Sequence, residues 1–173
     1  MRPAGKAFLF LAVFSILHFA HQVTGWSFLR VFSGTSESVF EHLKMAFWSY
    51  GVVSAVDLWL QWRAGRLEPA SDLFASALTI LLVPWVVAIV WYLWPGILGK
   101  TDTLAADLGW AIAVTTFAGW SGALVERELR RLEPSRTTRV LALALLAVSC
   151  FFFVRFSFGP PWLDLFVDPA VLR

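Results

Sequence analysis

Long apolar segments dominate this chain and limit what it can fold into. Five of them follow one another with short connections, and they cover about 6–23, 38–62, 73–94, 104–125 and 138–158. A segment of about 20 apolar residues is long enough to cross the hydrocarbon core of a bilayer as a helix. Inside a bilayer every backbone polar group needs an internal partner, which favours helices. The sequence therefore predicts an all-α, polytopic membrane helix bundle with five transmembrane helices.

Composition agrees with a membrane protein of one domain. Charged residues make up 15% of the chain, against about 25% in ordinary soluble domains. The five segments use most of the 173 residues, so we expect a single integral membrane domain over 1–173. The net charge is only +2, which speaks against a nucleic-acid partner. The expected partners are the lipid bilayer and, as an open alternative, another membrane protein or a second copy of the chain.

The basic residues predict the orientation of the chain. With five spans, the amino terminus and the second and fourth connections share one side, which holds Arg2, Lys6, Arg63, Arg66, Arg127, Arg130, Arg131, Arg136 and Arg139. The other side holds Arg30, Lys44, Lys100, Arg155 and Arg173. Because cytoplasmic loops are rich in Lys and Arg, we expect a multi-pass protein of the cytoplasmic (inner) membrane with its amino terminus inside and its carboxyl terminus outside. We expect the first segment to be retained, since it is too long for a signal peptide and lacks a small-residue cleavage pattern.

Two features of the apolar segments predict how the helices pack. Gly119 and Gly122 allow a neighbouring helix to approach closely. Pro84 interrupts the third segment, where a proline can kink a membrane helix without unfolding it.

The most unusual polar feature is the run 35–44, in which ionisable residues lead directly into an apolar helix. Charge at membrane depth is expensive and usually functional. On a helix, Glu37, Glu41 and Lys44 are spaced i, i+4, i+7 and share one stripe, so two carboxylates and an ammonium group can form a network. Capping of the helix start explains the serines and glutamates of the run. It does not explain His42 or Lys44, which lie deeper in the helix.

Three histidines predict a metal site as one interpretation. His18 and His21 lie in the last turns of the first segment, on the same predicted outer side as His42. Histidines at i, i+3 can converge on a divalent metal when a carboxylate faces them. No HExxH or similar zinc signature is present, so polar packing at the membrane interface is the other interpretation. No other cofactor is indicated.

Isolated charges elsewhere lead to three further expectations. Arg155 stands among phenylalanines and should pair with a carboxylate, either Glu37 or Glu41. We interpret Asp57 as an interfacial residue near the inner end of the second segment. The charged run 126–133 is interpreted as a solvated helix extension, with docking of a partner or of anionic lipid as the alternative.

Several short motifs occur in a fixed order. They are Leu17-His18-Phe19, the Glu37-Ser38-x-x-Glu41-His42-x-Lys44 element, Gly96-Ile97-Leu98-Gly99-Lys100, Phe156-Ser157-Phe158-Gly159-Pro160-Pro161-Trp162 and Phe166-Val167-Asp168-Pro169. The chain resembles an uncharacterised family of small prokaryotic polytopic membrane proteins in this order of motifs. That family has no established activity, so the resemblance implies fold and topology. The chain departs from it at Trp162, where the family commonly has a histidine after the paired prolines. If that histidine binds a metal or carries a proton in the relatives, this departure implies a lost or altered function here.

The motifs and the predicted topology together place one polar site at the outer face. Its predicted members are Glu37, Glu41, His42, Lys44, Arg155 and Lys100. We favour a binding or transport-related function, in which this site receives an ion, a small polar ligand or a partner subunit. One alternative is an integral-membrane metal-dependent or acid/base hydrolase acting on a lipid-like substrate. The other is a structural accessory subunit of a membrane complex.

Overall fold

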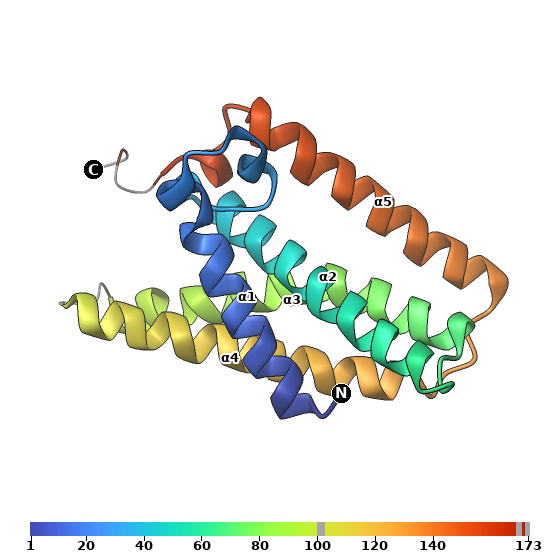
Figure 1. The fold of residues 1–173 in the computed structure, drawn as a ribbon. Helices are drawn as coiled ribbons and strands as arrows, with labels where there is room; N and C mark the ends of the chain where they lie inside the picture. The colour runs from blue at the N-terminus through green and yellow to red at the C-terminus, as the bar shows by residue number, and fades with distance from the viewer. Residues whose placement is uncertain (100–102, 169–170, 172–173) are drawn as a thin grey trace.

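The computed structural model describes residues 1–99, 103–168 and 171, and within them the chain is an all-helical bundle without strands (Figure 1). The long helices are α1 (Pro3–Thr24), α2 (Val39–Arg63), α3 (Pro69–Leu98), α4 (Leu104–Leu129) and α5 (Arg136–Phe158). Two short 3-10 helices, η1 (Ser27–Val31) and η2 (Asp164–Phe166), follow α1 and α5. The prediction of an all-α bundle is confirmed.

Four helices, α1, α3, α4 and α5, are long and apolar enough to cross a membrane. Together they give the molecule the character of a multi-pass membrane protein. The remaining long helix, α2, carries Glu41, Lys44 and Asp57, and all three side chains are buried inside the bundle. Because α2 packs closely against α3 and α1, its polar side chains face protein.

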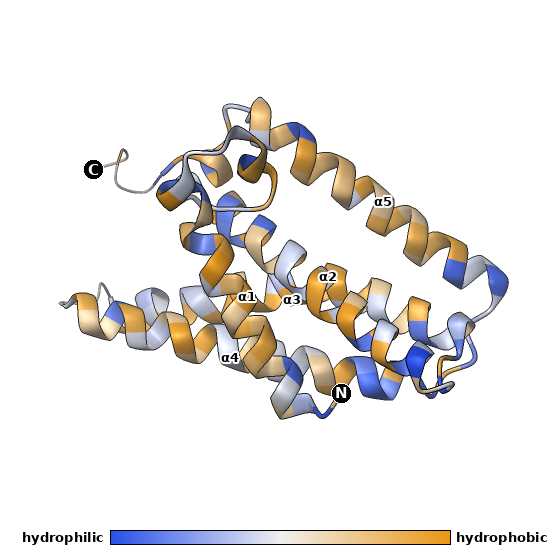
Figure 2. Cartoon of the chain, in the orientation of Figure 1, coloured by the Kyte–Doolittle hydropathy of each residue, from blue (hydrophilic) through white to orange (hydrophobic). Residues whose placement is uncertain are grey.

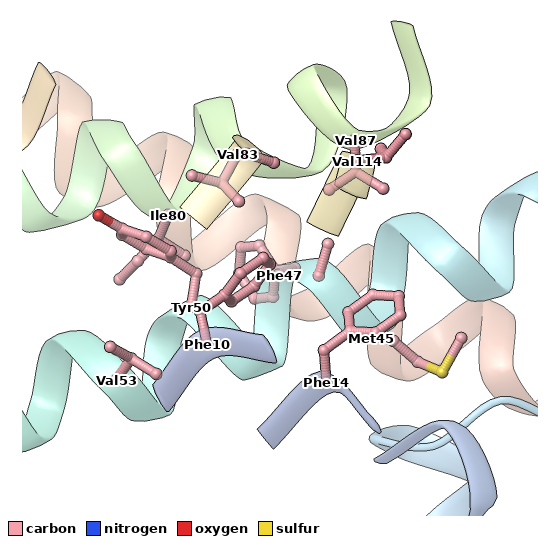
Figure 3. Packing of buried hydrophobic residues seen from close by; sticks show 12 residues of the cluster. Phe10, Phe14, Met45, Phe47, Tyr50, Val53, Ile80, Val83, Val87 and Val114 are labelled. Atoms are coloured by element: carbon pink, nitrogen blue, oxygen red, sulfur yellow. The ribbon is translucent and has the colours of Figure 1, made fainter. Parts of the chain in front are cut away.

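A shared core joins the first four helices. Phe10 and Phe14 of α1 meet Met45, Phe47 and Tyr50 of α2 there (Figure 3), and buried valines of α3 and α4 complete the cluster. The predicted close approach at two glycines of α4 is confirmed. A Cβ atom at Gly119 would lie 2.6 Å from Phe10 Cδ1, and one at Gly122 would lie 2.5 Å from Val83 Cγ2.

Two helices differ from the rest in their packing. Helix α3 continues through Pro84 to Leu98, as expected for a proline whose lost hydrogen bond does not break a membrane helix. Helix α5 lies along one side of the bundle (Figure 1), packs mainly on α3, and buries only Ala142 fully. Toward its carboxyl-terminal end it contacts α2 through Phe153, whose ring lies 4.8 Å from that of Phe47.

The helices alternate in direction, so each end of the bundle gathers polar residues from distant parts of the chain (Figure 2). We call the end formed by the starts of α1, α3 and α5 with the ends of α2 and α4 the arginine-rich end. We call the opposite end, formed by the end of α1, η1 and the start of α2, the histidine end. Which end faces the cytoplasm stays a prediction.

Candidate functional site

Three potential metal ligands from separate segments meet at the histidine end. His18 comes from the last turns of α1, Glu37 from the loop before α2, and His42 from the first turn of α2. Glu37 Oε2 lies 3.5 Å from His42 Nε2 and 4.0 Å from His18 Nε2. One ligand atom of each residue lies within 4.8 Å of the other two. Two of the three histidines predicted from the sequence therefore converge, and a carboxylate faces both.

These distances suit a single metal ion after a small adjustment. Donors bound to one tetrahedral zinc ion at about 2.0–2.1 Å lie about 3.4 Å from one another. The Glu37 side chain is 65% exposed, so its carboxylate is free to make the small movement. Two imidazoles and one carboxylate leave a fourth coordination position open.

Hydrogen bonding already orients one of the rings. His42 Nδ1 lies 3.0 Å from the carbonyl oxygen of Ser38, an acceptor only, so this nitrogen carries the proton. His42 Nε2 then faces Glu37 and His18. Histidines that bind metals commonly donate the second ring N–H to a carbonyl or carboxylate in this way. The indole of Trp91 stacks nearly parallel to the His42 ring, at 15° and 6.5 Å between centroids.

His18 is half-buried beside aromatic rings. Its ring centroid lies 4.8 Å from that of Phe19 and 5.6 Å from that of His42. His18 Nδ1 is buried, and no hydrogen-bond partner for it is present among the described residues. A buried polar atom without a partner calls for an explanation, and a bound ion or water is one.

A buried ion pair fixes the loop that carries Glu37. Lys44 Nζ donates to Glu41 Oε2 at 2.7 Å and to the carbonyl oxygen of Arg30 at 2.7 Å. The same Glu41 oxygen accepts from the backbone N–H of Thr35 at 2.8 Å. The expected pairing of Glu41 with Lys44 is therefore present, whereas Glu37 turns to the histidines. Glu41 and Lys44 position the site, and neither faces the candidate metal position.

The carboxyl-terminal tail covers part of this end. The backbone N–H of Glu37 donates to Asp168 Oδ2 at 3.2 Å. Phe166 of η2 packs on Phe40 of α2, with 4.6 Å between ring centroids. Trp162, by contrast, is 89% exposed. The tail motif therefore lies beside the site, as its predicted side implied.

Besides Glu41 and Lys44, two predicted site residues do not join the cluster, His21 and Arg155. His21 is absent from the group of converging ligands, although its backbone N–H helps to hold the loop through Ser33 Oγ at 2.9 Å. The predicted pairing of Arg155 with Glu37 or Glu41 is wrong, because Lys44 engages Glu41 and the histidines face Glu37. Arg155 instead donates to the carbonyl oxygen of Gly159, at 3.4 Å. Lys100 lies outside the described residues.

A second polar cluster occupies the arginine-rich end, and the sequence interpretation missed it. Lys6 Nζ lies 2.6 Å from Glu126 Oε2 and 3.5 Å from Asp57 Oδ2. Arg130 Nη2 lies 2.7 Å from the same Asp57 oxygen, and its Nε lies 3.3 Å from Asp72 Oδ1. The Met1 amine also contacts Asp57. The cluster ties α1, α2, α3 and α4 together.

Burial corrects two expectations here. Asp57 is 2% exposed and Glu126 is 1% exposed, so Asp57 is no isolated interfacial residue and Glu126 is no part of a solvated extension. Tyr50 and Ser76 donate to the two Glu126 oxygens at 2.9 and 3.0 Å. The signal that could have found the cluster is the predicted topology, which places Lys6, Asp57 and Glu126 at one end.

The charges of the second cluster are compensated. Burial would lower the pKa of the Arg130 guanidinium, but the carboxylates of Glu126 and Asp57 outweigh this effect and raise that pKa. Arg130 therefore stays charged at every accessible pH. Each buried acid of the cluster has a cationic partner, so the arrangement is that of a structural clamp.

Comparisons with known proteins add no assignment. No family model matches the chain, and neither a curated protein nor a solved structure matches it. The class defined by the described residues is a helical bundle with four helices able to cross a membrane and a histidine–carboxylate cluster at one end.

Proposed function

We propose that this protein is a multi-pass protein of the cytoplasmic membrane that binds a divalent transition metal through His18, Glu37 and His42. The observation that carries the proposal is the convergence of three ligand atoms within 4.8 Å from the end of α1, the loop before α2 and the first turn of α2. Imidazole and carboxylate donors suit zinc in particular.

The proposal includes five spans with the histidine end outside. Helix α2 has 25 residues, about 37 Å at 1.5 Å per residue, which exceeds the thickness of a hydrocarbon core of about 30 Å. Its buried acids and lysine are shielded by the other helices, as membrane bundles require. The dense basic residues of the opposite end support a cytoplasmic location for that end.

The ligand set also supports a hydrolase as a second candidate. Catalytic zinc sites have three protein ligands and an open position, and a set of two histidines and one glutamate is one such set. A metal here would lower the pKa of bound water to about 7 and supply a nucleophile. Because the Glu37 side chain is exposed, solvent or a lipid headgroup could reach the fourth coordination position of a metal bound here.

Metal content tests the proposal directly. The full chain is purified in detergent, loaded with zinc, desalted and analysed by elemental mass spectrometry beside His18→Ala, His42→Ala and the control His21→Ala. We expect about one equivalent in the wild type and the control, and a loss of at least tenfold in affinity in the other two variants. Equal zinc binding by all four folded proteins, or none by the wild type, would overturn the metal site.

A further inference from the structure

A groove at the arginine-rich end lies between the first turns of α3 and α5. Its volume is about 390 Å³. Arg136 and Arg139 line one part of it, and the rest of the lining is apolar: Pro69, Ala70, Leu73, Phe74, Val140 and Leu143. Leu73, Val140 and Leu143 are exposed, so the groove opens on the outer surface of the bundle.

The order of side chains along α5 divides the groove into a charged and an apolar part. Arg136, Arg139, Val140 and Leu143 are spaced i, i+3, i+4, i+7, which places them on one face of the helix. The arginines belong to the first turn, at the level of the helix ends, and Leu143 lies two turns deeper. A cationic end followed by an apolar wall along the helix axis matches the order of a phospholipid headgroup and its acyl chain.

The charges of the groove favour an anion. Its lining includes both arginines and no acidic residue. Arg139 Nε is buried and has no hydrogen-bond acceptor among the described residues. Three other arginines of this end are already paired, since Arg127 and Arg131 contact Glu128 and Arg130 contacts buried acids. Arg139 therefore has an unused donor that a phosphate oxygen would satisfy.

The adjoining hollow explains where the phosphate would lie. A second space of about 610 Å³ shares Pro69, Ala70 and Arg139 with the groove, and its lining adds Glu68 and Glu133 beside Arg130 and Arg131. Those two arginines already contact acids, and two carboxylates are present, so an anion is favoured less there than over Arg136 and Arg139, where the lining has no acidic residue. The start of α3 and the start of α5 both lie at this end, and the positive ends of their dipoles add to the attraction.

We propose that the groove binds one anionic phospholipid of the surrounding membrane. Its phosphate contacts Arg136 and Arg139, and one acyl chain lies along Leu73, Phe74 and Leu143. The inference depends on a membrane location and is independent of the metal site at the opposite end. Helix α5 buries only Ala142 fully. A lipid bound in the groove contacts both α5 and α3 and so helps to hold α5 against α3.

Native mass spectrometry of the full chain in detergent tests the proposal. The protein is titrated with phosphatidylglycerol, with phosphatidylcholine of the same acyl chains, and with inorganic phosphate. The test variants are Arg136→Gln/Arg139→Gln and Leu143→Trp, which fills the apolar part. The matched control is Arg66→Gln/Arg127→Gln, which removes the same charge at the same end outside the groove.

We expect phosphatidylglycerol to bind in preference to phosphatidylcholine. The groove double variant should lower its affinity about 30-fold, from about 1 kcal/mol per basic residue, and the control by less than about threefold because exposed charges interact weakly. Leu143→Trp should also weaken binding of the lipid. Equal binding of the two lipids, an equal loss in the control, or binding of inorganic phosphate as tight as that of the lipid would overturn a phospholipid site.

Discussion

Replacing Glu126 by glutamine should destabilise the bundle strongly, because this carboxylate joins four partners inside it. Lys6 Nζ lies 2.6 Å from it, and Tyr50 and Ser76 donate to it at 2.9 and 3.0 Å. Arg130 forms the fourth contact, at 2.5 Å. Glutamine preserves the shape but leaves the buried Lys6 ammonium with Asp57 alone, at 3.5 Å. Removing one partner of a buried pair costs about 3–5 kcal/mol, and we expect a loss in that range.

Glu128 offers a matched control on the same helix. It also contacts two arginines, Arg127 at 3.2 Å and Arg131 at 2.7 Å, but its side chain is 52% exposed. Exposed ion pairs contribute about 0–1 kcal/mol. Glu128→Gln should therefore change the free energy of unfolding by less than about 1 kcal/mol, although the chemical change is identical.

A double-mutant cycle isolates the pairing itself. Lys6→Met alone leaves the negative charge of Glu126 with Arg130 as its cationic partner. Glu126→Gln alone leaves the positive charge of Lys6 with the more distant Asp57. The double variant removes both charges, so its cost should be smaller than the sum of the two by about 2 kcal/mol. Unfolding is followed by circular dichroism in detergent with increasing dodecyl sulfate. A stability of Glu126→Gln equal to that of Glu128→Gln would refute the clamp.

Two further substitutions test the core and the loop. Gly119→Ala should lower stability by about 1–3 kcal/mol, since its Cβ would lie 3.2 Å from the Ala7 Cα; thermal unfolding should show no such loss for Gly109→Ala, which meets nothing within 4 Å. Lys44→Met should cost about 3 kcal/mol, because it leaves the buried Glu41 carboxylate without its cation. It should also weaken zinc binding in the elemental assay, and retention of full affinity would show that the ion pair does not position Glu37.

Local patterns in the sequence predicted the helices well. Hydropathy gave 104–125 for a helix that runs over Leu104–Leu129, and 138–158 for one that runs over Arg136–Phe158. The third segment was predicted too short, at 73–94, since the helix extends over Pro69–Leu98, with Pro69 in its first turn and Pro95 near its end. A proline in the first turn needs no N–H donor, and one near the end removes a single hydrogen bond.

Contacts between helices were harder to predict, because they depend on the rotation of each helix about its own axis. Because His18 and His21 lie three residues apart on one helix, their spacing does not show which of the two faces a carboxylate. Only the packing of α1 on its neighbours turns His18 toward Glu37 and leaves His21 aside. Lys6 and Glu126 are separated by 120 residues, and nothing local to either position identifies the other as its partner.

The two ends of α2 show why burial of charge alone does not identify a functional site. At the arginine-rich end Asp57 has two cationic side chains as partners, so its charge is already compensated within the protein. At the histidine end His42 Nδ1 donates to a backbone carbonyl, and His42 Nε2 faces a position shared with Glu37 and His18. The three ligand atoms there lie within 4.8 Å of one another, which is the physical reason why we propose a divalent metal, and with it the function, at this end.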